Sequence, residues 1–184
     1  MNKQKNISIL GSTGSIGYQA VDVIKKSNDN FKIKYLTVNS RFDLLEKQIS
    51  EISTENVVLT DIDAYKKFKE TTNFKGNILF GDEGLAQAAT DDEVDIVLTA
   101  LVGFSGVKPT YEAVKKGKTI ALANKETLVS AGKLITKLAQ ENNSQILAVD
   151  SEHSAILQCL AGEKEKMSKK LYLQHRVDLL EHGI

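Results

Sequence analysis

The sequence contains few of the residues from which disulfide-linked, zinc-binding or membrane-embedded proteins are built. Its 184 residues include one cysteine, one proline and no tryptophan. A single cysteine excludes an intramolecular disulfide and a zinc site with several cysteine ligands. Cys159 is therefore interpreted as a small apolar core residue, with a reactive thiol as the alternative. No apolar run approaches the roughly 20 residues that a membrane-spanning helix requires, so we expect no membrane partner.

The sequence also lacks an excess of charge of either sign. Lysine and arginine together number 24, aspartate and glutamate also number 24, and the net charge is zero. Without a basic excess we expect no nucleic-acid partner, and without an acidic tail we expect no basic partner. The N-terminal residues MNKQKN lead directly into an apolar run, so we expect no signal peptide and a cytoplasmic protein.

A glycine-rich turn stands between an apolar strand and an apolar-periodic helix near the N-terminus. The strand is expected at 7–10, the turn reads GSTGSIG at 11–17, and the helix is expected at 15–27. Glycines permit a tight turn that brings backbone N–H groups close to a pyrophosphate, and the positive end of the helix dipole faces the phosphate charge. This pattern predicts a dinucleotide site. Because the spacing is G-x-x-G-x-x-G rather than the commoner G-x-G-x-x-G, an ordinary turn is the alternative.

Apolar runs and helical patterns alternate along the chain. Strands are expected at 7–10, 32–38, 56–59, 77–80, 95–100, 119–122 and 145–149, and helices at 15–27, 41–51, 61–70, 83–89, 107–116 and 126–142. This alternation predicts an α/β fold, a doubly wound parallel sheet with helices on both faces. Right-handed crossovers place the carboxyl ends of the strands at one edge, where ligands bind. Pro109 suits the first turn of its helix.

The residues after the second expected strand bear on the choice of dinucleotide. NAD-binding sites usually place an acidic residue there, which binds the 2′-hydroxyl of the ribose. This chain has Ser40 and Arg41 instead. An arginine favours a 2′-phosphate through charge-assisted hydrogen bonds, so we expect NADP rather than NAD. The alternative is that Arg41 is a solvated residue at a helix start, with Asp43 as a carboxylate near the helix N-terminus.

Two carboxylates follow the last expected strand. Asp150 and Glu152 are two residues apart, and on an extended backbone such side chains share a face. They could converge on one divalent cation, and oxygen ligands suit Mg²⁺ or Mn²⁺, with a further ligand from elsewhere. Alternatively, Asp150 or Ser151 caps a helix that begins near His153, and His153 is a helix-start residue rather than a ligand.

Two further loops follow buried strands. Asn124-Lys125-Glu126 comes after the sixth expected strand, and its lysine could meet a phosphate or an enolate. A salt-bridged helix start is the alternative. The loop LVGFSG at 101–106 contains two glycines that would let its backbone approach a cofactor, although the same pattern also suits an ordinary turn.

Four of these segments together resemble the 1-deoxy-D-xylulose 5-phosphate reductoisomerases. They are GSTGSIG at 11–17, ALVGFSG at 100–106, GKTIALANKETLVSAG at 117–132 and VDSEHSAI at 149–156. ANKE followed by DSEH is far more specific than the glycine pattern. The family isomerises its sugar-phosphate substrate and then reduces it with NADPH to 2-C-methyl-D-erythritol 4-phosphate, in non-mevalonate isoprenoid synthesis. The resemblance implies the same reaction here.

The resemblance also implies a role for individual residues. The residues that would bind NADPH are Thr13, Gly14, Ser15, Ile16, Ser40, Arg41, Asn124 and Glu126. Those that would act on the substrate are Lys125, Ser151, Asp150 and Glu152, the last two as ligands of Mg²⁺ or Mn²⁺. A metal there would polarise the substrate carbonyl and stabilise the developing alkoxide. Asn39-Ser40-Arg41 differs from the Gly-Lys-Asn of some family members.

Family members are considerably longer than this chain, and the resemblance fades after residue 165. We expect an NADPH-binding domain at 1–149, the start of a catalytic, metal-binding domain at 150–166, and an aberrant or poorly ordered tail at 167–184. We therefore expect NADPH binding with negligible turnover, and the family suggests a homodimer. Another NADP-dependent reductase that needs no metal, or a non-catalytic dinucleotide-binding module, are the alternatives.

The tail is interpreted as the product of a shifted reading frame. One compatible set of codons for residues 174–183, read from its third base, encodes Ala-Ser-Gly-Gly-Pro-Phe-Arg-Thr-Trp, and the family has an S-G-G-P-F-R motif at this point. We expect the encoding DNA to lack one base near the codon for Gln174. Sequencing that DNA tests the hypothesis. Different codons, or no family-like sequence downstream in the other frame, would remove it.

Overall fold

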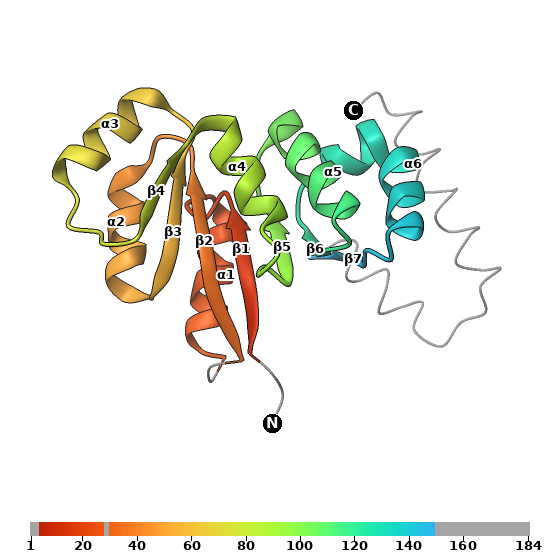
Figure 1. The fold of residues 1–184 in the computed structure, drawn as a ribbon, viewed down its shortest axis with the longest axis horizontal. Helices are drawn as coiled ribbons and strands as arrows, with labels where there is room; N and C mark the ends of the chain where they lie inside the picture. The colour runs from red at the N-terminus through yellow and green to blue at the C-terminus, as the bar shows by residue number, and fades with distance from the viewer. Residues whose placement is uncertain (1–3, 28–29, 150–184) are drawn as a thin grey trace. The chain divides into compact units, whose positions relative to one another are not determined.

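Seven parallel strands form one sheet in the order β4-β3-β2-β1-β5-β6-β7 (Figure 1). The computed structural model describes residues 4–27 and 30–149. The strands are β1 (Lys5–Leu10), β2 (Phe31–Val38), β3 (Thr54–Leu59), β4 (Asn77–Phe80), β5 (Ile96–Thr99), β6 (Thr119–Leu122) and β7 (Ile146–Ala148). Every neighbouring pair is parallel, which confirms the predicted sheet.

Helices connect the strands in the predicted order. They are α1 (Ser15–Lys25), α2 (Phe42–Glu51), α3 (Ile62–Thr71), α4 (Gly81–Thr90), α5 (Val107–Lys115) and α6 (Lys125–Glu141), with a short 3-10 helix, η1 (Gly103–Gly106), before α5. The ends of the predicted strands and helices are at most two residues from those observed. Pro109 lies in the first turn of α5, where its missing N–H costs no helical hydrogen bond.

The helices cover both faces of the sheet, which makes the fold doubly wound. One buried cluster joins the sheet to α1, α2 and α3 and includes Phe68. A second cluster joins the opposite face to α4, α5 and α6 and includes Leu85 and Ile135. Val57 and Val58 are consecutive in β3 yet belong to different clusters, because successive side chains of a strand point to opposite faces. Burial on both faces explains why the strands are continuous apolar runs.

The direction in which the sheet grows reverses between β1 and β5. From β1 the chain adds β2, β3 and β4 outward, and α4 then carries it back to the other side of β1, where β5, β6 and β7 follow (Figure 1). Leu10, the last residue of β1, pairs with Thr37 of β2 and with Thr99, the last residue of β5. The carboxyl ends of β1 and β5 therefore meet at one edge. In open α/β sheets, ligands bind in the crevice at such a reversal.

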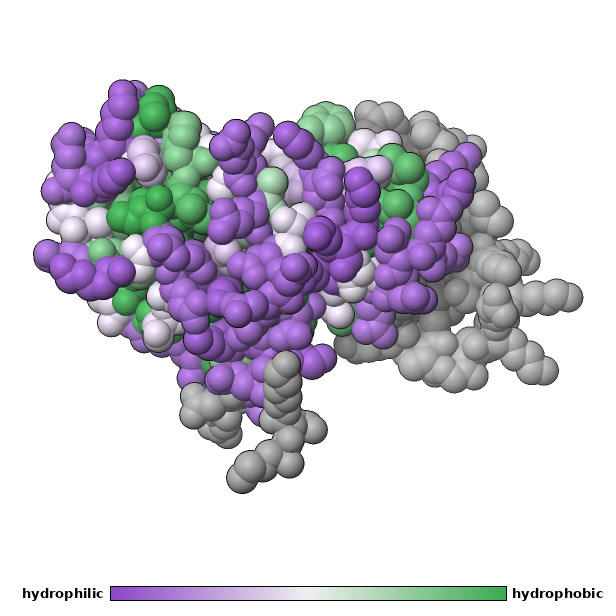
Figure 2. All heavy atoms as spheres, in the orientation of Figure 1, coloured by the Kyte–Doolittle hydropathy of each residue, from purple (hydrophilic) through white to green (hydrophobic). Residues whose placement is uncertain are grey.

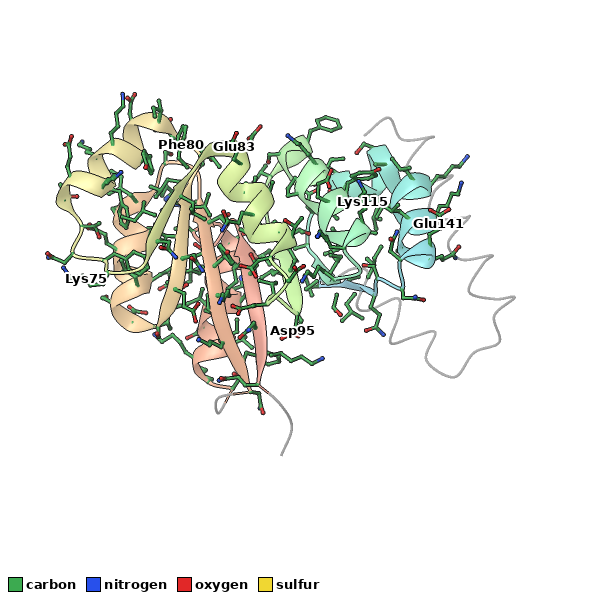
Figure 3. All side chains as sticks on the ribbon, viewed as in Figure 1. Lys75, Phe80, Glu83, Asp95, Lys115 and Glu141 are labelled. Atoms are coloured by element: carbon green, nitrogen blue, oxygen red, sulfur yellow. The ribbon has the colours of Figure 1, made fainter. Side chains whose placement is uncertain are left out.

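The face shown in Figure 2 is largely hydrophilic, with apolar atoms gathered over the region of β4 and smaller apolar patches over the region of α5 and α6. Glu83 and Glu141 are exposed and point away from the sheet (Figure 3). The ring of Phe80, at the end of β4, packs against Tyr65 of α3 with centroids 5.0 Å apart. None of the helices in the described part of the chain has the length and apolarity needed to cross a bilayer.

A buried tyrosine connects β2 to the turn between α4 and β5. Tyr35 is 1% exposed, and its hydroxyl donates a hydrogen bond to the carboxylate of Asp91 at 2.5 Å. Lys118 holds the same turn by donating to the carbonyls of Asp91 and Val94. Burial, followed by the bond to Asp91, raises the pKa of Tyr35 to about 12. The fold therefore stabilises the neutral form of this side chain.

We expect Tyr35 to make the protein less stable at alkaline pH. An unfolded tyrosine titrates near pH 10, whereas Tyr35 keeps its proton to about pH 12. Its contribution is therefore complete below the unfolded pKa and is lost as the pH rises through the folded one. One pKa unit corresponds to about 1.4 kcal/mol, so the loss should be about 1–3 kcal/mol.

Urea unfolding at a series of alkaline pH values measures this loss. In Tyr35→Phe the corresponding step should vanish, although the variant starts from a lower stability because it lacks the hydrogen bond to Asp91. The same decline in both proteins above the unfolded pKa would contradict the assignment to Tyr35.

Candidate functional site

Backbone hydrogen bonds to β2 hold the glycine loop between β1 and α1. The amides of Gly11 and Ser12 donate to the carbonyl of Thr37 at 3.1 and 2.8 Å, and the amide of Gly11 also donates to Thr37 Oγ1 at 3.0 Å. Gly11 has a φ of +87°, and a Cβ there would lie 2.7 Å from the carbonyl oxygen of Ala100. Only glycine therefore allows this loop to pass so close to the end of β5.

The other two glycines of the loop differ in what the fold requires of them. At Gly17 a Cβ would lie 2.2 Å from the carbonyl oxygen of Gly11, so this glycine lets α1 pack against the loop. At Gly14 φ is −74°, and the nearest atom to a Cβ would be 3.4 Å away, an ordinary contact. Neither backbone conformation nor internal packing demands a glycine at Gly14, so its missing side chain leaves room for a ligand.

A buried pair of side chains ties the same loop to α2. Ser12 Oγ donates to Gln48 Oε1, and Gln48 Nε2 donates to the carbonyl of Ser12, both at 2.8 Å. Ser12 is fully buried and Gln48 is 2% exposed. Reciprocal hydrogen bonds away from water hold the glycine loop and α2 at a fixed separation. Because α2 begins directly after Ser40 and Arg41, the same bonds also fix the position of these two residues relative to the glycine loop.

Helix α1 begins without a capping side chain. Its N-cap is Gly14, and its first turn contains no acidic residue. By contrast, Asp61 and Asn124 cap α3 and α6, each accepting a hydrogen bond from a first-turn amide at 2.8 Å. The first amides of a helix have no partner within it, so those of Ser15 and Ile16 can donate to an anion, which the helix dipole also favours.

A cleft of about 730 Å³ opens where the strand order reverses. Four residues predicted to bind the cofactor line it, namely Thr13, Gly14, Ser40 and Arg41. It is also lined by Leu101, Val102, Phe104 and Ser105 of the loop that was expected to approach a cofactor. The volume lies within the range of cofactor sites.

Other lining residues were missed by the sequence analysis, among them Thr60, Asp82, Lys108 and Glu112. Thr60 directly follows β3, and its place at the carboxyl end of a parallel strand could have identified it as a lining residue. The three charged residues lie on α4 and α5. Only the packing of those helices brings them to the cleft, and no local pattern marks them.

Ser40 and Arg41 form the turn from β2 to α2 at the cleft. Both are exposed, and Arg41 is the N-cap of α2 without a side-chain capping bond. Asp43 lies in the first turn of α2, as its alternative interpretation supposed. Within residues 4–27 and 30–149, Arg41 forms no ion pair. Its guanidinium is therefore available to a phosphate.

Three predicted residues meet at the start of α6 rather than in the cleft lining. Asn124 is 2% exposed, and its side chain hydrogen-bonds to the loop after β5 and to the first turn of α6. The hydrogen-bonding capacity of the Asn124 side chain is used inside the protein, and its predicted contact with the cofactor stays a prediction. Lys125 is exposed and Glu126 half-buried, both in the first turn of α6, and their roles stay predictions.

The predicted metal site lies outside the described residues. This applies to Asp150, Ser151, Glu152 and His153, and equally to Cys159 and the tail at 167–184. The chain divides into two units, Met1–Val149 and Asp150–Ile184, and the first contains the sheet and the cleft. In the part of the chain that the structure describes, no three acidic, histidine or cysteine side chains gather as a metal site would need.

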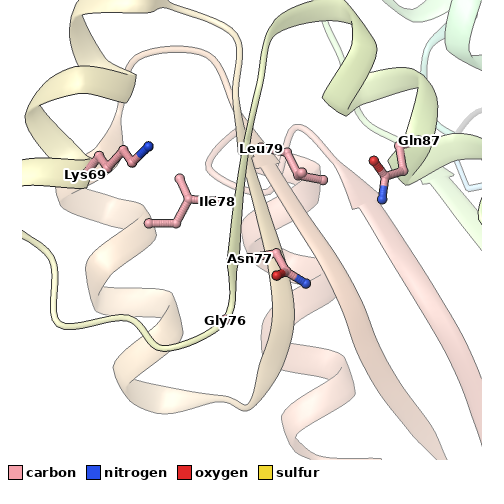
Figure 4. Close-up of a pocket in the computed structure, with 6 residues that line it drawn as sticks. All are labelled: Lys69, Gly76, Asn77, Ile78, Leu79 and Gln87. Carbon is pink, nitrogen blue, oxygen red and sulfur yellow. The ribbon is translucent and has the colours of Figure 1, made fainter.

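A second hollow, of about 570 Å³, lies along the edge strand β4 (Figure 4). Its lining residues are Lys69, Gly76, Asn77, Ile78, Leu79 and Gln87. Figure 4 shows Ile78 and Leu79 on opposite sides of the strand, so the hollow follows the open edge of the sheet. It offers one cation and two amide side chains. The cleft at β1 and β5 combines an arginine with an uncapped helix start and is the better candidate.

The family model described as 1-deoxy-D-xylulose 5-phosphate reductoisomerase matches residues 7–132. This span contains the glycine loop, the Ser40–Arg41 turn, the loop after β5 and the start of α6. The chain belongs to the 1-deoxy-D-xylulose 5-phosphate reductoisomerase family. The resemblance drawn from the four sequence segments is confirmed.

Reductoisomerases from several bacteria are similar to this chain. That of Geobacillus sp. (strain WCH70) is 46% identical over 169 residues, which cover 92% of this chain and 44% of the relative. That of Clostridium perfringens (strain SM101 / Type A) is 47% identical over 172 residues, 92% of this chain and 45% of the relative. The chain thus spans less than half the length of these reductoisomerases.

Solved reductoisomerase structures share the fold. The enzyme from Zymomonas mobilis in complex with NADPH is 36% identical with a TM-score of 0.80, over 85% of this chain and 41% of that chain. A reductoisomerase in complex with NADPH, fosmidomycin and magnesium is 40% identical with a TM-score of 0.78, over 84% of this chain and 38% of that chain. These matches confirm the predicted α/β fold with a doubly wound parallel sheet.

Alanine at Gly14 should impair dinucleotide binding more than folding. The new Cβ would occupy space that the fold leaves open, and overpacking of roughly 1–3 kcal/mol corresponds to a tenfold to hundredfold weaker affinity for NADPH. The free energy of unfolding should fall by only about 0.5–1 kcal/mol, the usual cost of alanine at an N-cap. Calorimetric titration and chemical unfolding measure the two effects.

Gly17→Ala in the same loop is the matched control. Its Cβ would meet the backbone of Gly11, so this variant should lose stability first and bind weakly only because it unfolds. Wild-type NADPH affinity in Gly14→Ala would contradict the interpretation of the space at Gly14.

Proposed function

We propose that this chain binds NADPH in the cleft at β1 and β5, as the cofactor-binding part of a 1-deoxy-D-xylulose 5-phosphate reductoisomerase. The observation that carries the proposal is the open space at Gly14 directly before the uncapped start of α1. A pyrophosphate fits such a place, because it needs close approach to the backbone, free N–H donors and the positive end of a helix dipole. The NADPH complex of the Zymomonas mobilis relative supports the assignment.

The two phosphate-bearing parts of NADPH would be held by two different elements. The residues for the pyrophosphate are Thr13, Gly14, Ser15 and Ile16, and those for the 2′-phosphate are Ser40 and Arg41. Arg41 is exposed at the cleft and has no ion-pair partner in the described part of the chain, so it can form charge-assisted bonds to a phosphate. Bound NADPH would supply a hydride for reduction.

The reaction of the whole protein is proposed by family membership. In that assignment the substrate is 1-deoxy-D-xylulose 5-phosphate, Lys125 and Ser151 contact it, and Asp150 and Glu152 hold Mg²⁺ or Mn²⁺. Oxygen ligands suit either cation, and a magnesium-bound relative supports the choice of metal class. Lys125 lies exposed in the first turn of α6, at the same edge of the sheet as the cleft, where an anionic substrate can reach it.

We propose further that the 184 residues by themselves bind NADPH without appreciable turnover. They span less than half the length of the related reductoisomerases. The family resemblance implies a third carboxylate ligand for the metal in the remainder. The proposed location is the cytoplasm, because a single cysteine suits a reducing compartment. The proposed assembly is a homodimer, on the ground of family membership.

The cofactor assignment predicts a preference for NADPH over NADH that depends on Arg41. In Arg41→Ala the affinity for NADPH should fall by roughly tenfold to a hundredfold, because hydrogen bonds to charged groups contribute about 1.5–3 kcal/mol. The affinity for NADH, which has no 2′-phosphate, should stay the same. Calorimetric titration of the purified chain with both cofactors measures this difference.

Lys47→Ala is the matched control, because it removes an exposed positive charge from the same helix away from the cleft lining. It should leave both affinities unchanged. Equal wild-type affinity for NADPH and NADH would overturn the role of Arg41. Metal-dependent NADPH oxidation with 1-deoxy-D-xylulose 5-phosphate at ordinary enzyme rates would overturn the proposed lack of turnover.

A further inference from the structure

Asn124 lies where β6, α6 and the loop after β5 meet. Its side-chain Nδ2 donates to the carbonyl of Leu101 and, at 2.9 Å, to the carbonyl of Gly103. Its Oδ1 accepts from the amide of Thr127 at 2.8 Å and from Thr127 Oγ1 at 2.7 Å. The side chain is 2% exposed. Asn124 thus links two segments that are more than twenty residues apart in the sequence.

These four hydrogen bonds use the full capacity of the amide. An asparagine side chain has two N–H donors and one carbonyl oxygen with two lone pairs. The oxygen caps α6, and the nitrogen serves the loop instead. The two halves of the amide therefore have separate tasks, and neither has a donor or acceptor left for a ligand.

The loop that Asn124 holds forms one wall of the cleft. Leu101, Val102, Phe104 and Ser105 line the cleft, and the side chains of Val102 and Phe104 are 86% and 76% exposed. Side chains this exposed add little buried apolar contact to hold the wall. Leu101 packs against the buried cluster that includes Leu85 and Ile135, and hydrogen bonds to the backbone of Leu101 and Gly103 further fix the position of the wall.

A buried glycine packs directly against the amide. Gly106 ends η1 and is buried, and a Cβ there would lie 3.1 Å from both Cγ and Nδ2 of Asn124. Any larger residue would press on an amide that four hydrogen bonds hold in place. A Cβ at position 106 would therefore force the Asn124 amide or the 3-10 helix to move by a few tenths of an ångström.

We infer that Asn124 is a positioning residue, which fixes the Leu101–Ser105 wall of the cofactor cleft and joins it to the start of α6. The inference rests on the proposed NADPH site for its functional meaning, but the clamp itself is a property of the protein alone. Through it, the wall of the cleft and the helix start that carries Lys125 and Glu126 are held as one unit.

Asn124→Asp separates the two tasks. A carboxylate oxygen can still accept from Thr127, and aspartate is a good N-cap residue, so α6 stays capped. The other oxygen replaces the donor and faces the carbonyls of Leu101 and Gly103, so the clamp is lost. Hydrogen exchange of the 101–106 segment should accelerate by about tenfold, because buried polar groups are left unpaired. Exchange at the start of α6 should not change.

The affinity for NADPH gives a second readout. In Asn124→Asp the Kd should rise by about tenfold, because a loosened wall must be ordered when the cofactor binds. Gly106→Ala keeps the asparagine at position 124 but should loosen the same wall, because its Cβ would press on the Asn124 amide. It keeps the inference testable should Asn124→Asp fail to fold.

Thr127→Val is the matched control. It removes one hydrogen bond to the same amide but keeps both bonds to the loop, so exchange at 101–106 and the Kd should match the wild type. Wild-type exchange at 101–106 in Asn124→Asp would overturn the inference. So would equal acceleration of the loop and of the α6 start in Asn124→Asp and Thr127→Val, which is the pattern of a helix cap alone. A wild-type chain that binds no NADPH would defeat the proposed function, whereas the exchange comparison would still decide the role of Asn124.

Discussion

The close approach of the β1–α1 loop to the end of β5 is the constraint on which the cleft depends. Gly11 passes so near Ala100 that a Cβ would lie 2.7 Å from its carbonyl oxygen. Because the two segments touch at the point where the strand order reverses, the start of α1 lies beside the loop after β5. A side chain at Gly11 would push these ends apart, and the open helix start would no longer face the same cleft as the loop.

Buried polar side chains hold the walls of this cleft at fixed positions. Ser12 and Gln48 join the glycine loop to α2, and Asn124 joins the loop after β5 to α6. Each group is nearly inaccessible to water, so the hydrogen bonds are costly to break. The apolar clusters on the two faces of the sheet supply most of the stability. The polar pairs set the positions of the loops, which apolar packing alone leaves adjustable.

Family membership and the share of the relatives' length that the chain covers together set what is proposed for these 184 residues. The described part contains the elements for a dinucleotide, and the relatives of more than twice the length include reductoisomerases with NADPH and magnesium bound. Its sheet is covered on both faces by its own helices, which supports the proposal that this unit folds and binds NADPH by itself. A reaction that also needs metal and substrate ligands from elsewhere requires more than this unit.

The sequence by itself determined the α/β fold, the order of its strands and helices, the glycine loop and the turn at Ser40 and Arg41. These features are local, because apolar periodicity, glycine spacing and the residue type after a strand can be read in short windows. Only the tertiary structure decided that Asp82, Lys108 and Glu112 line the cleft, since they reach it from α4 and α5. The tertiary structure also turned the Asn124 side chain inward, and it separated Gly14 from the glycines that the fold needs. Those outcomes depend on the distances between segments that are far apart in the chain. A short stretch of sequence carries no information on such distances.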